Sequence, residues 1–182
     1  QYPYPLDQDV ESLRGQLGEI RDNFIWAPGQ VVWDDPSIVE HDKEAAVMHE
    51  ALHRKLQTLE KEVLIESAYF VVRERAIEAA KKMVEKGVRI RILTNSLASN
   101  PGTISNSGLS KQRAAVLNAG VELHELRTDA AVKPAYESPP HVARYLGLHG
   151  KIYVIDRERT YLGSVNLDPR SRHLNTEMGI LI

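Results

Sequence analysis

The chain has 182 residues, a formal net charge of −2, 42% hydrophobic and 26% charged residues, and no cysteine. This length suits one globular domain with a sizeable core, and the lack of cysteine excludes disulfide bonds and thiolate catalysis. The near-neutral charge argues against a protein that binds nucleic-acid backbones, because such proteins usually have a basic excess.

Residues 1–42 differ from the rest of the chain, because turn-forming and aromatic residues gather in "QYPYP", "WAPG" and "DDPS". We expect a linker or an arm that precedes the domain. Four residues between these turns have loose helical spacing: Val10, Leu13, Leu17 and Ile20. The chain starts without Met and stops within the apolar run "EMGILI", so we expect a piece of a longer protein, truncated at its C-terminus. No apolar run reaches the roughly 18 residues of a membrane span.

Residues 43–182 alternate between helix and strand patterns, and we assign them to one domain. Residues 43–60 have helical spacing. The spacing next predicts strands at 62–70, 88–96 and 121–127, with helices at 73–87 and 108–120 that stop at Gly87 and Gly120. Three more strands are predicted at 148–155, 160–167 and from residue 176. We therefore expect an α/β fold with a mixed, mostly parallel sheet flanked by helices, and an antiparallel hairpin at its end.

The predicted hairpin contains the stretch "HGKIYVIDRERTYLGSVNLDPRS", residues 149–171. His149 and Lys151 point to the same side, because side chains alternate along a strand. A turn of two or four residues at "DRER" would pair residues whose numbers sum to 315. This register places Asn166 opposite His149 and Ser164 opposite Lys151, about 5 Å apart. Four polar groups are therefore expected on one face.

The other face of this hairpin is expected to pack into the core through Ile152 and Val154. Asp156 falls on the parity of the apolar face or within the turn.

The polar face suits a phosphate group. An imidazole is a competent nucleophile near neutral pH, while a Lys ammonium and an Asn amide donate to anionic oxygens. A solvent-exposed strand face is the alternative for any single histidine. If each residue type occurs at roughly 5% of positions, all six specified types fall at their places from a given starting residue with a chance on the order of 10⁻⁸. The functional interpretation is therefore favoured.

The pattern H-x-K-x4-D-x6-G-S-x-N resembles the HKD signature of the phospholipase D superfamily. Outside it, "TNSLASN", "NAGVELHEL" and "NLDPRSRHLNTEMGILI" are similar to bacterial cardiolipin synthases, nearest the C type. The resemblance covers residues 63–182. Members of this branch carry two HKD halves on one chain, so we expect the second half together with the linker before it.

The resemblance implies a phospholipase D-like fold and a role for each motif residue. His149 is implied as the histidine that forms a phosphohistidine or acts as acid and base, with Lys151 and Asp156 completing the catalytic signature. Lys151 and Asn166 are implied as phosphate ligands. Ser164 is expected to bind phosphate as well, because it is predicted on the same face of the hairpin. The two supporting residues are Gly163 and Glu177, whose carboxylate is expected to orient a histidine.

The expected function is phosphodiester exchange on a phospholipid, most simply phosphatidyl transfer that makes cardiolipin. A second histidine is needed, from the other HKD half or from a symmetric copy. The expected partners are a phospholipid and a membrane surface, at the cytoplasmic face of a bacterial inner membrane, and nucleic acid is not expected. Two alternatives remain open: a nuclease or hydrolase of the same superfamily that acts as a homodimer, and an inert half-domain.

Other histidines carry weaker signals. His41 and Lys43 repeat H-x-K, but Met48 stands where Asp is needed. His49 and His53 have the i, i+4 spacing of metal ligands without an evident third ligand, so we expect no metal and no cofactor.

Overall fold

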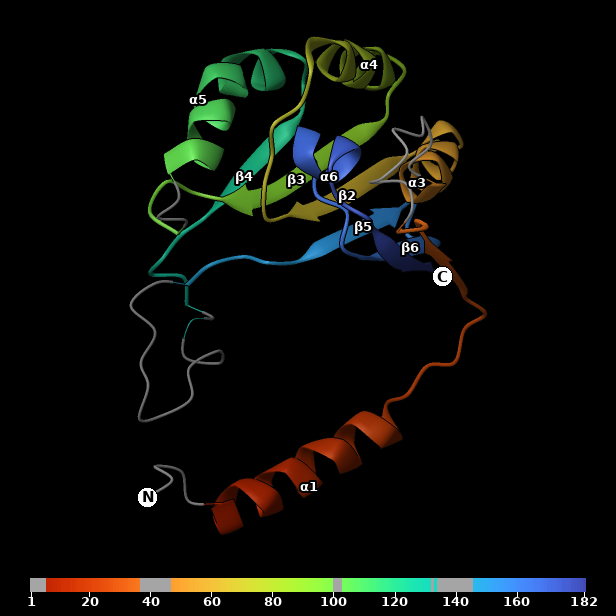
Figure 1. Cartoon of the computed structure of the whole chain (residues 1–182), viewed down its shortest axis with the longest axis vertical. Coiled ribbons are helices and arrows are strands. Elements are labelled where there is room, and N and C mark those ends of the chain that lie inside the picture. The colour runs from red at the N-terminus through yellow and green to blue at the C-terminus, as the bar shows by residue number, and fades with distance from the viewer. Residues whose placement is uncertain (1–5, 37–46, 100–102, 132, 134–145) are drawn as a thin grey trace.

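The computed structural model describes residues 6–36, 47–99, 103–131, 133 and 146–182 (Figure 1). Their strands form a seven-stranded sheet in the order β1-β7-β6-β5-β2-β3-β4. The strands are β1 (Gln30–Trp33), β2 (Glu62–Ser67), β3 (Arg89–Asn95), β4 (Glu122–Leu126), β5 (Lys151–Ile155), β6 (Arg159–Gly163) and β7 (Met178–Leu181). The helices are α1 (Leu6–Asp22), α3 (Val47–Gln57), α4 (Glu74–Glu85), α5 (Thr103–Asn118) and α6 (Pro169–His173).

The sheet has a parallel part and an antiparallel part. Strands β2, β3 and β4 run parallel, with α4 and α5 as the crossovers between them. The other four neighbouring pairs are antiparallel: β2 with β5, β5 with β6, β6 with β7, and β7 with β1. The expected α/β class, mixed sheet, flanking helices and hairpin are confirmed. The expectation of a mostly parallel sheet is wrong. Strand β5 pairs with β2 in the antiparallel sense, and each later neighbouring pair is antiparallel as well.

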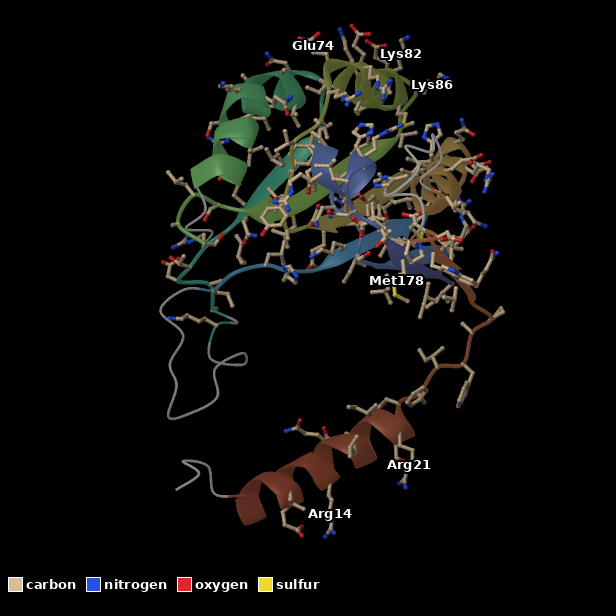
Figure 2. The ribbon with its side chains drawn as sticks, in the orientation of Figure 1. Arg14, Arg21, Glu74, Lys82, Lys86 and Met178 are labelled. Carbon is tan, nitrogen blue, oxygen red and sulfur yellow. The ribbon has the colours of Figure 1, made fainter. Side chains whose placement is uncertain are left out.

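The helices α3, α4, α5 and α6 lie on one face of the sheet, and α1 lies apart from it (Figure 1). Helix α3 contacts β1, α4 contacts β3, and α5 contacts β4. None of the described helices covers the opposite face, where Leu162, Met178 and Ile180 are exposed. Figure 2 shows the Met178 side chain on this uncovered side. The core therefore forms between the helices and one face of the sheet.

The core depends on alternate strand residues of β2 and β5. Val63 and Ile65 of β2 are paired with Ile155 and Tyr153 of β5, and all four are buried. Tyr153 packs edge-on against the ring of Tyr161, with 5.4 Å between ring centroids. Each fully buried large apolar side chain contributes about 1.5–3 kcal/mol. The expectation that Ile152 and Val154 enter this core is wrong.

The predicted helix ends at glycines are confirmed. Gly87 adopts a φ of +91° and Gly120 a φ of +84°, the left-handed region in which glycine is favoured. The Gly87 N–H donates to the Val84 carbonyl at 2.9 Å, which satisfies a carbonyl of the last turn of α4. These two stops place β3 and β4 at the ends of their crossovers.

Part of the segment 1–42 joins the sheet. Residues 30–33 form the edge strand β1, in which Val31 pairs with Ile180 of β7. Residues 6–22 form α1, whose described side chains are almost all exposed. The expected linker or arm therefore contains one strand that completes the sheet. For the helix expected at 43–60, the described part is Val47–Gln57.

Candidate active site

The histidine and the lysine of the motif lie at the start of β5. His149 is exposed and lies two residues before the strand, whereas Lys151 is its first residue and is only 9% exposed. Lys151 lies on the helix-covered face beside Ser67 of β2. Its Nζ donates to the His149 carbonyl at 2.7 Å, which uses one of its three N–H donors.

The ammonium group of Lys151 is partly desolvated. Desolvation lowers the pKa of the Lys151 ammonium below its usual value, and the nearby carboxylates of Glu177 and Asp168 oppose this effect. Among the described residues the other two N–H donors of the ammonium have no partner, so they can serve an anionic ligand.

A buried amide holds the segment that leads to His149. Asn95, at the end of β3, donates to the Leu148 carbonyl at 2.9 Å and accepts from the Leu148 N–H at 2.8 Å. Its Oδ1 also accepts from Ser99 at 3.0 Å. Both backbone polar groups of the residue before His149 are thereby fixed. The sequence analysis gave Asn95 no role, although it quoted "TNSLASN"; an amide that ends a buried strand was the available signal.

The register of the hairpin differs from the prediction by one residue. Ile152 pairs with Leu162, and Ile155 with Arg159, so paired numbers sum to 314 rather than 315. The reason is a three-residue loop, Asp156–Glu158, because an odd loop shifts the pairing by one. Lys151 is therefore level with Gly163, and neither Ser164 nor Asn166 lies within β6.

The segment after β6 brings Asn166 beside β2 by other means. Its backbone N–H donates to Ser171 Oγ at 3.0 Å, and the next N–H, of Leu167, donates to Ser67 Oγ at 3.1 Å. Asp168 caps α6 by accepting from the N–H groups of Arg170 at 2.7 Å and Ser171 at 3.0 Å.

The Asn166 side chain is buried, yet its Oδ1 has no hydrogen-bond partner among the described residues. An unpaired amide in a buried place is costly unless a ligand satisfies it.

Glu177 connects the two serines of this segment. Its buried carboxylate accepts from Ser164 Oγ, from Ser171 Oγ at 2.6 Å and from Asn175 Nδ2 at 3.3 Å. Three donors stabilise the charge and fix the loop that carries Asn166. Among the described residues these side-chain contacts come from hydroxyl and amide groups, and the expected role in orienting a histidine stays a prediction.

A buried aspartate of the N-terminal arm supports Glu177. The Asp34 carboxylate accepts from the Glu177 N–H at 2.9 Å and from the Met48 N–H at 2.8 Å. The Asp34 N–H in turn donates to the Glu177 carbonyl at 2.8 Å. Strand β1 and α3 are thereby tied to the site, which the sequence analysis did not foresee.

Gly163 has a steric role at the end of β6. A Cβ at this position would lie 2.6 Å from Tyr161 Cζ and would also overlap the Met178 carbonyl. Its absence lets the Tyr161 hydroxyl accept from the Val165 N–H at 3.0 Å. This bond bends the chain from β6 towards Asn166.

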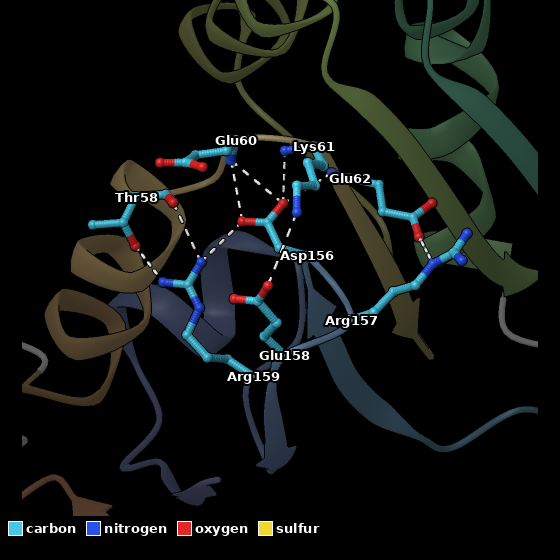
Figure 3. Close-up of polar contacts among 8 residues, drawn as sticks. All are labelled: Thr58, Glu60, Lys61, Glu62, Asp156, Arg157, Glu158 and Arg159. Atoms are coloured by element: carbon cyan, nitrogen blue, oxygen red, sulfur yellow. Dashed lines mark hydrogen bonds and ion pairs between the residues drawn. The ribbon is translucent and has the colours of Figure 1, made fainter.

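Asp156 does not join the other motif residues. It lies at the far end of β5, about 17 Å from Lys151 at 3.3 Å per residue. Its carboxylate accepts from the N–H groups of Lys61 at 2.7 Å and Glu62 at 3.0 Å, and from Arg159 at 2.9 Å (Figure 3). Desolvation raises its pKa, but these backbone donors and Arg159 together hold the pKa below its usual value.

The carboxylate of Asp156 ties the hairpin loop to the start of β2, and no contact joins it to another motif side chain among the described residues. The structure thus supports a role in the fold, and the catalytic role given to Asp156 stays a prediction.

The remaining histidines add no second centre in the described part of the chain. His53 Nε2 hydrogen-bonds Gln57 at 3.2 Å, and His124 is exposed on β4. Within the described residues, no three metal-ligating side chains gather at one place. His41, Lys43 and His141 lie outside the described residues. The roles given to His149, Lys151, Ser164 and Asn166 stay predictions.

The fold and this site define an α/β domain in which the first residue of β5, Lys151, and the segment that follows β6 both meet Ser67 of the central strand β2. The family model "Cardiolipin synthase, PLD-like domain" matches residues 52–182, so the chain belongs to this family. The resemblance to the phospholipase D superfamily and its cardiolipin synthase branch is confirmed.

Two relatives from Escherichia coli K12 show the extent of the likeness. Cardiolipin synthase C is 37% identical over 167 residues, which cover 87% of this chain and 34% of that protein. Cardiolipin synthase B is 28% identical over 152 residues, which cover 84% of this chain and 31% of that protein. The chain thus spans about a third of the length of these relatives.

Two solved structures confirm the fold. Nuc from Salmonella typhimurium, a phospholipase D family member, has a TM-score of 0.55 and 15% identity, with 85% of this chain and 82% of that chain covered. Phosphatidylserine synthase from Haemophilus influenzae has a TM-score of 0.58 and 14% identity, with 99% and 42% covered. Among the described helices, none combines the length and apolar character needed to cross a bilayer.

Proposed function

We propose that this chain supplies one half of the active site of a phospholipid phosphatidyltransferase that makes cardiolipin. One observation carries the proposal. Lys151 and Asn166 are buried and, within the described part of the chain, keep unused hydrogen-bonding capacity, in the motif that also holds the exposed His149. Buried polar groups of this kind are usually paired, so their free capacity fits the non-bridging oxygens of a phosphodiester.

The reaction proceeds in two displacements at phosphorus. In the first, a nitrogen of His149 bonds to phosphorus while the bond to the leaving alcohol breaks, and a second imidazole gives that oxygen its proton. In the second, an acceptor alcohol gives its proton to that imidazole and bonds to phosphorus as the phosphorus–nitrogen bond breaks. Lys151 and Asn166 hold the charge on the phosphoryl oxygens, and we expect no metal or cofactor.

The second histidine comes from another HKD half of the parent chain or from a symmetric copy of this one. Expelling an alkoxide without an acid is slow, because general acid catalysis contributes about 10² to 10⁴-fold. Glu177 acts as a positioning residue through Ser164 and Ser171, while Gly163 and Asp156 shape the hairpin.

We place the protein peripherally at the cytoplasmic face of a bacterial inner membrane. The segment after α1 supports contact with a lipid surface, because Ile25 and Trp26 are 89% and 88% exposed and Phe24 is 59% exposed. Aromatic side chains of this kind favour the interface between lipid headgroups and acyl chains.

The test is the change His149→Asn in the full-length parent protein. Turnover of phosphatidylglycerol to cardiolipin, followed by mass spectrometry, should fall by about 10² to 10⁴-fold. A rapid acid quench of the unmodified protein should leave a phosphatidyl adduct on the peptide that contains His149. Excess chelator should leave turnover intact. His124→Asn, on the exposed side of β4, is the matched control.

Near-normal turnover of His149→Asn, or an adduct on another residue, would contradict the proposal. The alternatives give different results. A homodimeric nuclease or hydrolase would cleave an oligonucleotide or a soluble diester with a rate that rises with the square of the chain concentration. An inert half-domain would show no turnover until the other half is added.

A further inference from the structure

A large groove opens on the helix-covered face of the sheet. It lies among α3, α4, α6 and strands β2 and β3, with a volume of about 1350 Å³. This exceeds the roughly 300–1,000 Å³ of typical small-molecule pockets. The floor is apolar and includes Leu56, Phe70, Ile77, Met83, Ile90 and Leu167. A groove of this size and composition suits a long hydrocarbon chain.

The rim of the groove carries positive charge. Arg75 of α4, Arg172 of α6 and His49 of α3 line it, and Arg73 donates to His173 Nε2 at 2.9 Å. Within the described residues, no carboxylate pairs with Arg73, Arg75 or Arg172.

The acid on this rim is already neutralised. Glu50 accepts from Arg54 at 2.9 Å, so it does not offset the arginines.

His173 responds to this charge, and His49 adds a buried polar atom to the groove. The pKa of His173 is lowered, first by desolvation and then by the positive charges of four neighbours: Arg73, Arg172, His49 and Arg75. His49 Nε2 is buried and has no hydrogen-bond partner in the described part of the chain. Unpaired cations over an apolar floor are complementary to an amphiphile with an anionic head.

The groove shares a wall with the proposed phosphoryl-transfer site. Leu167 lines the groove, follows Asn166 and donates from its N–H to Ser67 Oγ. Asn166 precedes the first turn of α6, and His173 ends this helix. The five residues of α6 span about 7.5 Å along its axis, at 1.5 Å per residue. A phosphate on the rim and a phosphate on Lys151 and Asn166 would therefore be near neighbours without being the same group.

We propose that this groove binds the acceptor phospholipid, with an acyl chain on the apolar floor and its phosphate held by Arg73, Arg75 and Arg172. This inference rests on the proposed phosphatidyl transfer and adds a second lipid site to it. The headgroup alcohol of the acceptor then extends towards His149, where it displaces the imidazole from phosphorus. The alcohol of the donor lipid has left by this step. The alcohols of the two lipids therefore bond to the phosphorus one after the other, while the two lipids bind at different places.

The test compares transfer with hydrolysis in the full-length parent protein, with phosphatidylglycerol vesicles as the lipid. Water competes with the lipid acceptor for the phosphohistidine, so loss of acceptor binding lowers the ratio of cardiolipin to phosphatidic acid. For the double change Arg75→Gln and Arg172→Gln, this ratio should fall at least about tenfold, and the KM for the acceptor should rise. Lys82→Gln removes a charge from the solvent side of α4 (Figure 2) and should keep the original ratio.

A titration of His173 by nuclear magnetic resonance tests binding directly on the 182-residue chain. Short-chain phosphatidylglycerol should raise the His173 pKa, because its phosphate offsets the neighbouring arginines. Short-chain phosphatidic acid should act alike, and inorganic phosphate should need far higher concentrations.

These results separate the two proposals. If the unmodified protein makes neither cardiolipin nor phosphatidic acid, the proposed function fails. If it makes both and the arginine variant keeps the original ratio, the acceptor groove is wrong and the proposed function stands. Equal affinity for inorganic phosphate and the short-chain lipids would overturn the acyl part of the inference.

Discussion

The two ends of β5 both carry buried polar side chains, but they use their hydrogen-bonding capacity differently. At the start, Lys151 donates one hydrogen bond to the His149 carbonyl, and the buried side-chain oxygen of Asn166 has no partner among the described residues. At the other end, Asp156 accepts from several backbone N–H groups and from Arg159. Spare capacity costs stability and is retained where a ligand uses it, whereas a saturated carboxylate stabilises the fold.

The largest expected effect is at the unsaturated end. Lys151→Met in the full-length parent should lower turnover by about 10² to 10³-fold, because one donor to the phosphoryl oxygens is lost. The free energy of unfolding should stay equal or rise, since a desolvated charge is replaced by an apolar side chain of similar length. Kinetics on phosphatidylglycerol and urea unfolding measure the two quantities. Lys111→Met on the exposed side of α5 is the control.

Normal turnover of Lys151→Met would show that the N–H donors of Lys151 take no part in the reaction. It would contradict the functional difference between the two ends of β5.

The next effect is at the saturated end and is structural. Asp156→Ala leaves Arg159 and the backbone N–H groups of residues 60–62 without their acceptor, and should lower the free energy of unfolding by about 3 kcal/mol. The turnover of the folded fraction should stay within about threefold of the original, because this carboxylate lies at the far end of β5. Asp129→Ala, at an exposed ion pair with Arg127, should leave stability unchanged.

Loss of turnover with unchanged stability in Asp156→Ala would show that Asp156 acts in the chemistry and would contradict its structural role.

The pH dependence of stability sharpens this result. The folded-state pKa of Asp156 lies below its unfolded value of about 3.9. Its stabilising contribution is therefore complete above about pH 4, and is lost as the pH falls through the lower folded-state pKa. Urea unfolding from pH 6 to pH 3 should show a smaller loss for Asp156→Asn than for the unmodified chain. Parallel pH curves for the two proteins would contradict the assignment.

The smallest effect separates two buried tyrosines. Burial raises the pKa of Tyr161 to about 12, so its hydroxyl is neutral; it accepts from the Val165 N–H at 3.0 Å and donates to the Met178 carbonyl at 3.4 Å. Tyr161→Phe should lower the free energy of unfolding by about 1 kcal/mol. The Tyr153 hydroxyl has no partner among the described residues, so Tyr153→Phe should be neutral or stabilising. Thermal unfolding measures the stability of both variants, and an equal loss of stability in the two would contradict the different roles given to these hydroxyl groups.

Much of the fold followed from local patterns. The strand at 62–67, the helix at 74–85 and its stop at Gly87 lie within two or three residues of their predicted bounds, because apolar periodicity and a left-handed glycine are signals carried by adjacent residues. The motif residues were also found from spacing alone. Local spacing could not predict the positions of Ser164 and Asn166 relative to β5, because these positions depend on the length of the loop after Ile155.

The sequence by itself determined the α/β class and the glycine stops, and it predicted the residues proposed for the chemistry, because each depends on local spacing. Only the tertiary structure decided the partner of β5 and the register of its hairpin. Asp156 and Arg157 take φ values of +54° and +60°, which build an odd loop and set the register in which Ile152 pairs with Leu162. It also decided that Asn95 and Asp34 support the site, because their contacts with Leu148 and Glu177 join residues that are far apart in the chain. Such contacts form when the sheet closes, and no local pattern encodes them.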